Sequence, residues 1–155
     1  MARNLSCAVL LLNDHAQLLL CHVTGKRWWD VPKGLQEPGE TPRETALREL
    51  ADETGLVLRS DELLDLGRFV YRPDKDLHFF AACRASDALD LSRCCCSSHF
   101  EDPRTGRPCP EVDAFEWVPF AHVGARCSKT MGQVLTGVID LESVLRRVQP
   151  HEQGD

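Results

Sequence analysis

The segment that most constrains the fold is residues 41–55, where local signals define both ends of one helix. Thr41 precedes Pro42 and is followed three residues later by Glu44. This is the arrangement of a capping box with proline at the first helical position. Gly55 supplies a stop signal. We therefore expect a helix over residues 41–54.

The predicted helix carries an apolar face and a separate acidic stripe. Glu49, Asp52 and Glu53 are spaced three and four residues apart, so they lie close together on a helix. Like charges at these spacings repel each other unless a cation or Arg48 offsets them. Hard divalent ions, above all magnesium, prefer such oxygen ligands. An acidic string alone is more often a solvated helix face, so the surrounding residues must decide.

Length and charge limit the class of protein. The 155 residues fit one domain, predicted over residues 1–150, with a disordered tail over 151–155. No apolar run approaches the roughly 20 residues that span a bilayer, and no cleavage site follows the first apolar run, so we expect a cytoplasmic protein without membrane contact. The net charge of -6 argues against binding to duplex nucleic acid. An anionic substrate would then need bound cations.

The apolar runs predict a set of strands and one further helix. The predicted strands are residues 6–12, 18–23, 28–31, 66–71, 77–83 and 115–118. The first two read as a hairpin, and a Pro- and Gly-rich loop follows over residues 32–40. Residues 84–110 lack any period and are predicted to be a long loop or insertion. Residues 133–148 predict a terminal amphipathic helix.

The helix and the loop before it resemble a known motif. Residues 34–56, with Gly34, Glu40, the run Arg48-Glu49-Leu50 and the run Asp52-Glu53-Thr-Gly55-Leu56, resemble the Nudix box, Gx5Ex7REUxEExGU with U aliphatic. Asp52 is the one departure, because the family has Glu there. The resemblance implies an α/β fold, specifically an α/β/α sandwich with a mixed central β-sheet, and a pyrophosphohydrolase activity.

Metal ligands follow from the same resemblance. It implies that Glu49 and Glu53 are the principal ligands of Mg²⁺, with Mn²⁺ as a possible substitute. Asp52, one methylene shorter than Glu, would assist directly or through water. The carbonyl of Lys33 lies close enough in the family to serve as another ligand. The resemblance thus implies a divalent-metal hydrolase.

Supporting roles are implied for three further box residues. Arg48 would hold the carboxylates by charge-assisted hydrogen bonds. Glu40 would brace the loop against the helix, and Gly34 would supply backbone freedom.

A second resemblance lies downstream of the box. The segment Glu111-Val-Asp-Ala-Phe-Glu-Trp117-Val118 is similar to the ExxxxxWV segment of the dinucleoside polyphosphate and RNA pyrophosphohydrolase branches. It implies that Glu111 is an extra metal ligand or the general base, with Glu116 as the alternative. A surface glutamate ahead of an edge strand is the competing interpretation.

The lead-in to the box bears on the substrate. Trp29-Asp-Val-Pro-Lys-Gly34 resembles the W-x-x-P-K-G sequence of diadenosine polyphosphate and diphosphoinositol polyphosphate hydrolases. We therefore expect a small nucleotide-like substrate, first a dinucleoside polyphosphate, with ADP-ribose or an RNA 5′ end as alternatives. Lys26, Arg27 and Lys33 are candidates for outer phosphates, and Tyr71 for substrate binding; each is equally compatible with an ordinary surface or core position.

Two broader alternatives stay open. A Nudix-fold module that binds a nucleotide without turnover is the competing class, although such modules generally lose box carboxylates. The chain could be a monomer or a homodimer. Base stacking and core packing both fit the aromatic side chains, with core packing more common; these are Trp28, Trp29, Tyr71, Phe79 and Phe80.

The cysteines divide into two groups. Cys7, Cys21 and Cys83 sit in strand-like apolar runs and are predicted to be buried free thiols. A second group lies within the insertion and consists of Cys94, Cys95, Cys96, His99 and Cys109. Its spacing does not fit the paired modules of structural zinc sites, so we do not expect zinc.

Overall fold

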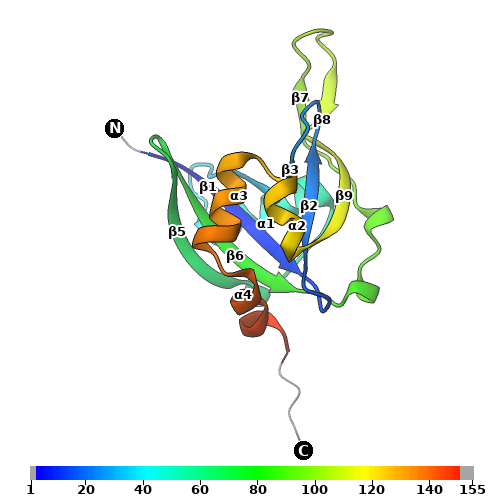
Figure 1. Ribbon diagram of the computed structural model, residues 1–155. Coiled ribbons are helices and arrows are strands. Elements are labelled where there is room, and N and C mark those ends of the chain that lie inside the picture. Colours follow the sequence, from blue (N-terminus) through cyan, green and yellow to red (C-terminus); the bar gives the residue numbers. More distant parts are fainter. Residues whose placement is uncertain (1–2, 151–155) are drawn as a thin grey trace, which may run out of the picture.

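The computed structural model describes residues 3–150 and places helices on both faces of one mixed β-sheet (Figure 1). The predicted tail, residues 151–155, lies outside the described residues. The strands of the sheet are β1 (Asn4–Leu12), β2 (Gln17–Val23), β3 (Trp29–Asp30), β4 (Lys33–Leu35), β5 (Leu64–Arg72), β6 (Lys75–Cys83) and β9 (Val112–Pro119). β1 and β6 run parallel, and the other pairs are antiparallel. The predicted mixed sheet is confirmed.

The predicted amino-terminal hairpin is confirmed at its turn, but its two strands pair only there. β1 and β2 pair through Leu12 and Leu18, and then the two strands separate. Along the rest of its length β1 pairs with β6 and β4, while β2 pairs with β9. β1 is buried on both faces, and a strand of this kind takes its neighbours from distant parts of the chain.

The two helical layers rest on alternate side chains of β1. Val9 and Leu11 pack with Leu50 of α1 (Pro42–Thr54) on one face. Leu10 and Leu12 belong to the core on the opposite face, beneath α2 (Phe120–Arg126), α3 (Lys129–Gln133) and α4 (Leu141–Val148). Because strand side chains alternate between faces, one strand supplies both cores. The predicted α/β/α sandwich is confirmed.

The ends of α1 are those that the sequence predicts. The Thr41 hydroxyl accepts a hydrogen bond from the Glu44 amide at 3.2 Å. Gly55 ends the helix with φ at 80°, and its amide donates to Ala51 O at 2.8 Å. A residue with a Cβ rarely adopts this left-handed conformation, so the helix ends at this glycine.

The predicted single helix over residues 133–148 is interrupted. A π-helical turn (Val134–Val138) follows α3, and Ile139 is then extended, with φ at -100° and ψ at 129°. The Asp140 side chain accepts from the Ser143 amide at 3.2 Å and caps α4. A short polar side chain that caps a new helix competes with continuation of the old one. No helix among residues 3–150 is long and apolar enough to cross a membrane.

The predicted long loop over residues 84–110 contains local structure. Two short 3-10 helices, Ser86–Ala88 and Leu91–Arg93, precede a hairpin of β7 (His99–Glu101) and β8 (Pro108–Pro110). Outside this segment, a further 3-10 turn (Ser60–Glu62) lies before β5. Figure 1 shows this hairpin projecting from the body of the fold. In the segment between the 3-10 helices and the hairpin, the Ser97 amide donates to the Asp52 carbonyl at 2.7 Å. The Cys95 amide donates to the Thr54 carbonyl at 3.0 Å. The insertion thus satisfies carbonyl groups that the end of α1 leaves unpaired.

Candidate functional site

Three carboxylates meet beside the sheet. Glu49 and Glu53 come from successive turns of α1, and Glu111 directly precedes β9. Each offers an oxygen, and these oxygens all lie within 4.8 Å of one another. Glu53 is buried, with 6% of its surface exposed, and Glu111 is the most exposed of the three. Among residues 3–150, these three carboxylates are the group whose ligand atoms lie close enough together to hold a metal ion. The cysteines of residues 94–109 do not form such a group.

Backbone contacts hold Glu111 at this position. Its amide donates to Ser98 O at 3.1 Å, and its carbonyl accepts from the Thr24 amide at 3.2 Å. The Ser98 hydroxyl also donates to Glu111 Oε2 at 3.2 Å. The end of the insertion and the end of β2 therefore carry Glu111 to α1.

Asp52 lies outside this carboxylate cluster. Its side chain is 40% exposed, and its nearest ionic partner is Arg48, 3.5 Å away. Successive residues of a helix are rotated by about 100°, so Asp52 points away from the direction of Glu53. The structure does not group it with the three other carboxylates that were predicted as ligands.

Gly34 makes room for the Glu49 carboxylate. A Cβ atom at residue 34 would lie 2.1 Å from Glu49 Cδ. Gly34 is not among the described glycines with positive φ, so the expectation that it supplies backbone freedom is wrong. The close approach of a charged side chain, and not a special φ, requires glycine here.

Arg48 and Glu40 form the frame behind the site. Arg48 Nε donates to Glu40 Oε2 at 2.7 Å, and Arg48 Nη1 donates to Glu49 Oε1 at 2.7 Å. Glu40 also accepts from the Glu37 amide at 3.0 Å and from the Thr45 hydroxyl at 3.0 Å. The Arg48 hydrogen bond, supported by those from the Glu37 amide and the Thr45 hydroxyl, outweighs the opposite effect of burial and lowers the pKa of Glu40 to about 2. Glu40 thus joins the loop to the helix, as predicted.

Burial of the two helical carboxylates disfavours their charged forms. It raises the pKa of Glu53 to about 9, against the hydrogen bond from the Lys33 amide. Burial likewise raises the pKa of Glu49, against its bond with Arg48. A divalent cation would reverse this balance, because it favours ionised oxygens around it. The residues present therefore fit such an ion.

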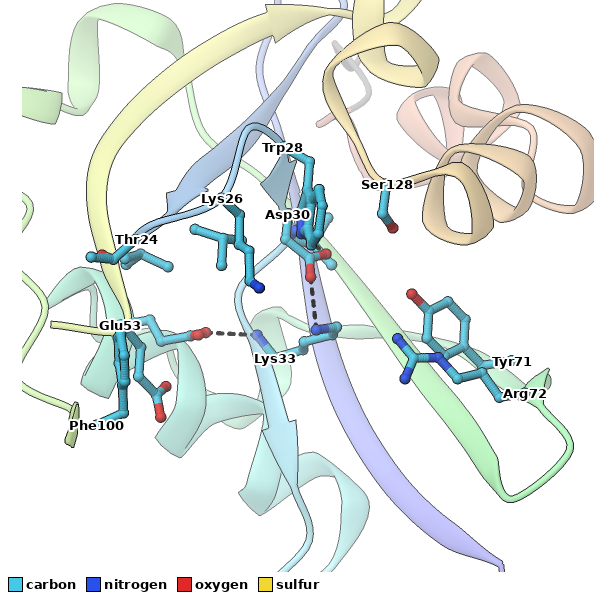
Figure 2. A pocket seen from close by; sticks show the side chains of 14 residues that line it. Thr24, Lys26, Trp28, Asp30, Lys33, Glu53, Tyr71, Arg72, Phe100 and Ser128 are labelled. Carbon is cyan, nitrogen blue, oxygen red and sulfur yellow. Dashed lines mark hydrogen bonds and ion pairs between the residues drawn. The ribbon is translucent and has the colours of Figure 1, made fainter. Parts of the chain in front are cut away.

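Lys33 contacts the cluster through its backbone. Its amide donates to Glu53 Oε2 at 2.7 Å, and its ammonium forms an ion pair with Asp30 at 2.7 Å (Figure 2). Burial lowers the pKa of Lys33, but Asp30 outweighs it and leaves that pKa raised. The ammonium is therefore already paired, and a ligand role for the Lys33 carbonyl stays a prediction.

A cleft of about 450 Å³ opens next to the carboxylates. Lys26, Lys33 and Tyr71 line it, as expected of substrate-binding candidates, whereas Arg27 does not. Glu116, the alternative to Glu111, pairs with Arg126 instead. Of the predicted aromatic residues, Phe79 and Phe80 belong to the core. Trp28 is exposed and lines the cleft (Figure 2), whereas Trp29 does not line it.

Sequence reasoning missed three residues of this region. Arg72 and Phe100 line the cleft, and Lys75 lines an adjoining groove together with Glu49 and Glu111. Arg72 and Lys75 flank the turn between β5 and β6, so a basic pair around a predicted turn was the available signal. Phe100 lies in the insertion, where no periodic pattern pointed to it.

The thiols are all free, and the prediction of their burial holds in part. Cys7 and Cys21 are fully buried, whereas Cys83 is half-buried at the end of β6. Cys127, which the sequence did not single out, is also buried. Burial raises the pKa of Cys127 to about 12, so this thiol is held in its neutral form.

Comparisons with known proteins agree with this geometry. A family profile described as NUDIX domain matches residues 2–135. An uncharacterized 17.7 kDa protein of Enterobacteria phage T4 is 33% identical over 126 residues, which are 76% of this chain and 83% of that protein. An RNA pyrophosphohydrolase of a Marinomonas species is 40% identical over 56 residues, 36% of this chain and 35% of its own. The crystal structure of a C. elegans Ap4A hydrolase shares the fold with a TM-score of 0.61 and 16% identity, over 92% of this chain and 98% of that one.

Proposed function

The chain belongs to the NUDIX domain family, and on that premise we propose that it is a divalent-cation-dependent pyrophosphohydrolase that cleaves a diphosphate linkage in a nucleotide-like polyphosphate. The observation that carries the proposal is the cluster of Glu49, Glu53 and Glu111 beside a cleft lined with cationic side chains. The match to an RNA pyrophosphohydrolase covers only part of either chain, so the carboxylate cluster is the main support for this activity.

Glu49 and Glu53 would hold Mg²⁺, or Mn²⁺ in its place, and Glu111 would complete the site as a further ligand or as the general base. The bound ion supplies charge neutralisation at the phosphate oxygens and lowers the pKa of water. Arg48 holds the Glu49 oxygen in place, and the Lys33 amide does the same for Glu53. A role for Asp52 would be indirect, since it faces away from the cluster.

Glu111 is our candidate for the group that removes the proton from the attacking water. It is the most exposed of the three carboxylates, and it lines the cleft. Its Oε2 accepts one hydrogen bond, from the Ser98 hydroxyl, which leaves lone pairs free for a water molecule. General-base assistance is typically worth about 10²- to 10⁴-fold in rate.

A long phosphate chain is the substrate feature that the cleft favours. Lys26, Lys33 and Arg72 line the cleft, and Lys75 lines an adjoining groove that shares Lys33 and Glu111 with it. Cations spread over the cleft and the adjoining groove suit a substrate with a long run of phosphates. This supports a dinucleoside polyphosphate over the two phosphates of ADP-ribose. A net charge of -6 makes an RNA 5′ end the weaker alternative.

The test is turnover of a panel containing diadenosine polyphosphates, ADP-ribose, nucleoside triphosphates and 5′-triphosphate RNA, with and without Mg²⁺. Glu53→Gln removes a ligand charge, and Glu44→Gln, on an exposed turn of the same helix, is the matched control. We expect Mg²⁺-dependent turnover that Glu53→Gln reduces by more than about 100-fold and that Glu44→Gln leaves unchanged. Tight binding of one panel member without turnover of any would instead indicate a non-catalytic binding module.

A further inference from the structure

Phe100 is an exposed aromatic side chain that lies in the cleft without belonging to either core. It is 38% exposed, and it is carried by β7 of the projecting hairpin (Figure 1). The two cores of the fold do not include it. Single exposed apolar residues are common, so exposure alone has little meaning. Its place among the cleft-lining residues is what calls for an explanation (Figure 2).

The hairpin itself has no role in the main sheet. β7 pairs with β8 in a separate two-stranded sheet, and the residues of β7 are all exposed. An isolated hairpin is marginally stable in water and contributes little to a core. The base of the hairpin is nonetheless fixed to the site, because Ser98 before β7 and Glu111 after β8 are joined by two hydrogen bonds. The fold thus anchors an exposed hairpin directly at the catalytic carboxylate.

Charged and apolar side chains line the cleft together. Besides the carboxylates and cations, the lining includes Val23, Val112 and Phe100, and Phe100 lies beside Glu53 (Figure 2). Trp28, also 38% exposed, is a second aromatic lining residue. A nucleotide whose phosphates lie at the carboxylates must place its nucleoside against neighbouring side chains of the cleft. A planar base suits an aromatic, apolar surface of this kind.

We propose that Phe100 binds the nucleobase of the substrate by stacking, so that the β7–β8 hairpin is the base-recognition element of this protein. The proposal deepens the proposed function and rests on it for the identity of the substrate. A phenyl ring offers no hydrogen bond to the base edge, so the preference follows stacking area and purines bind better than pyrimidines. Base identity within the purines is read weakly by this residue.

The test compares two probes that differ only in the base, AMP and ribose 5-phosphate, by equilibrium titration of the full chain. Wild-type protein is expected to bind AMP more tightly than ribose 5-phosphate. Phe100→Ala should weaken AMP binding at least about fivefold, equivalent to about 1 kcal/mol at 1.4 kcal/mol per tenfold, and leave ribose 5-phosphate unchanged. Phe100→Tyr keeps the ring and should retain the difference. Val57→Ala, at an exposed position away from the cleft, is the control.

Each outcome bears on the proposal separately from turnover. Equal binding of the two probes by the wild-type protein, including no detectable binding of either, overturns it. So does a Phe100→Ala variant that still distinguishes them as well as the wild type does. A base preference that depends on Phe100, found in a protein that turns over no substrate, would support this inference while the proposed hydrolysis fails.

Discussion

The backbone of Gly34 lies directly against the carboxylate of Glu49, so closely that a Cβ atom at residue 34 would overlap Glu49 Cδ at 2.1 Å. The glycine and the carboxylate therefore depend on each other. β4 brings the one and α1 brings the other, and β1 holds both elements, by pairing with β4 and by packing against α1.

Gly34→Ala should displace Glu49 without unfolding the protein. The clashing atoms are the far end of a flexible side chain, so the chain can relieve the overlap by rotating Glu49 away. The rotation breaks its bond with Arg48, at a cost of about 1 kcal/mol. We expect Mn²⁺ affinity, measured by calorimetry, to fall at least about tenfold, as when a partner that orients a ligand is lost. Unchanged affinity would show that Glu49 does not need this position.

Glu111 and Asp52 should differ in their effect on turnover. Glu111 shares the cluster with Glu49 and Glu53, whereas Asp52 faces solvent beside Arg48. We expect Glu111→Gln to reduce kcat by about 10²- to 10⁴-fold, and Asp52→Asn by less than about tenfold. Steady-state kinetics at saturating Mg²⁺ measures both. Equal losses would mean that Asp52 takes a direct part.

Glu40 should stabilise the protein in a pH-dependent way. Its pKa is lowered to about 2 from an ordinary 4.5, so the folded protein favours the ionised form. The stabilisation is then fully present above the unfolded value and is lost as pH falls toward the folded value. Glu40→Gln should lower the free energy of unfolding by about 1–2 kcal/mol at pH 7 after allowance for solvent screening, and by clearly less at pH 3.

Urea unfolding at the two pH values measures this difference. Glu37→Gln is the matched control, because Glu37 is 64% exposed and lies 3.9 Å from Arg48. It should change stability little at either pH. A difference between Glu40→Gln and wild type that stays constant with pH would contradict the assignment.

We expect Lys75 to destabilise the folded protein and to assist substrate binding. Burial lowers its pKa, as do the positive charges of Lys33 and Arg72. Lys75→Met removes the repulsion and keeps the aliphatic stem. We expect the midpoint of thermal unfolding to rise slightly, with a gain of up to about 1 kcal/mol. The KM for a dinucleoside polyphosphate should rise while that for ADP-ribose changes less. A lower midpoint with unchanged KM values would reject an anion-binding role.

The sequence predicted what is local in the chain. The ends of α1 depend on Thr41 and Gly55, whose hydrogen bonds reach only a few residues away. The spacing of Glu49 and Glu53 on that helix is likewise fixed by helical geometry. The mixed sandwich was predicted from the resemblance to the family rather than from periodicity. Periodicity alone predicted an amino-terminal hairpin, whose strands pair only beside the turn.

Tertiary structure decided the pairing partners and the composition of the site. β1 is buried on both faces, so the backbone N–H and C=O groups along both of its edges need hydrogen-bond partners. β6 supplies one set of partners, and the order of the strands in the sequence does not reveal this. The exclusion of Asp52 from the carboxylate cluster depends on how α1 is rotated against the sheet. The placement of Lys75 and Phe100 depends on where two hairpins project. Local sequence thus determined the helix and its charges, while contacts between distant segments determined which of those charges meet. The reason is that packing, and not order along the chain, decides which residues are close in the fold.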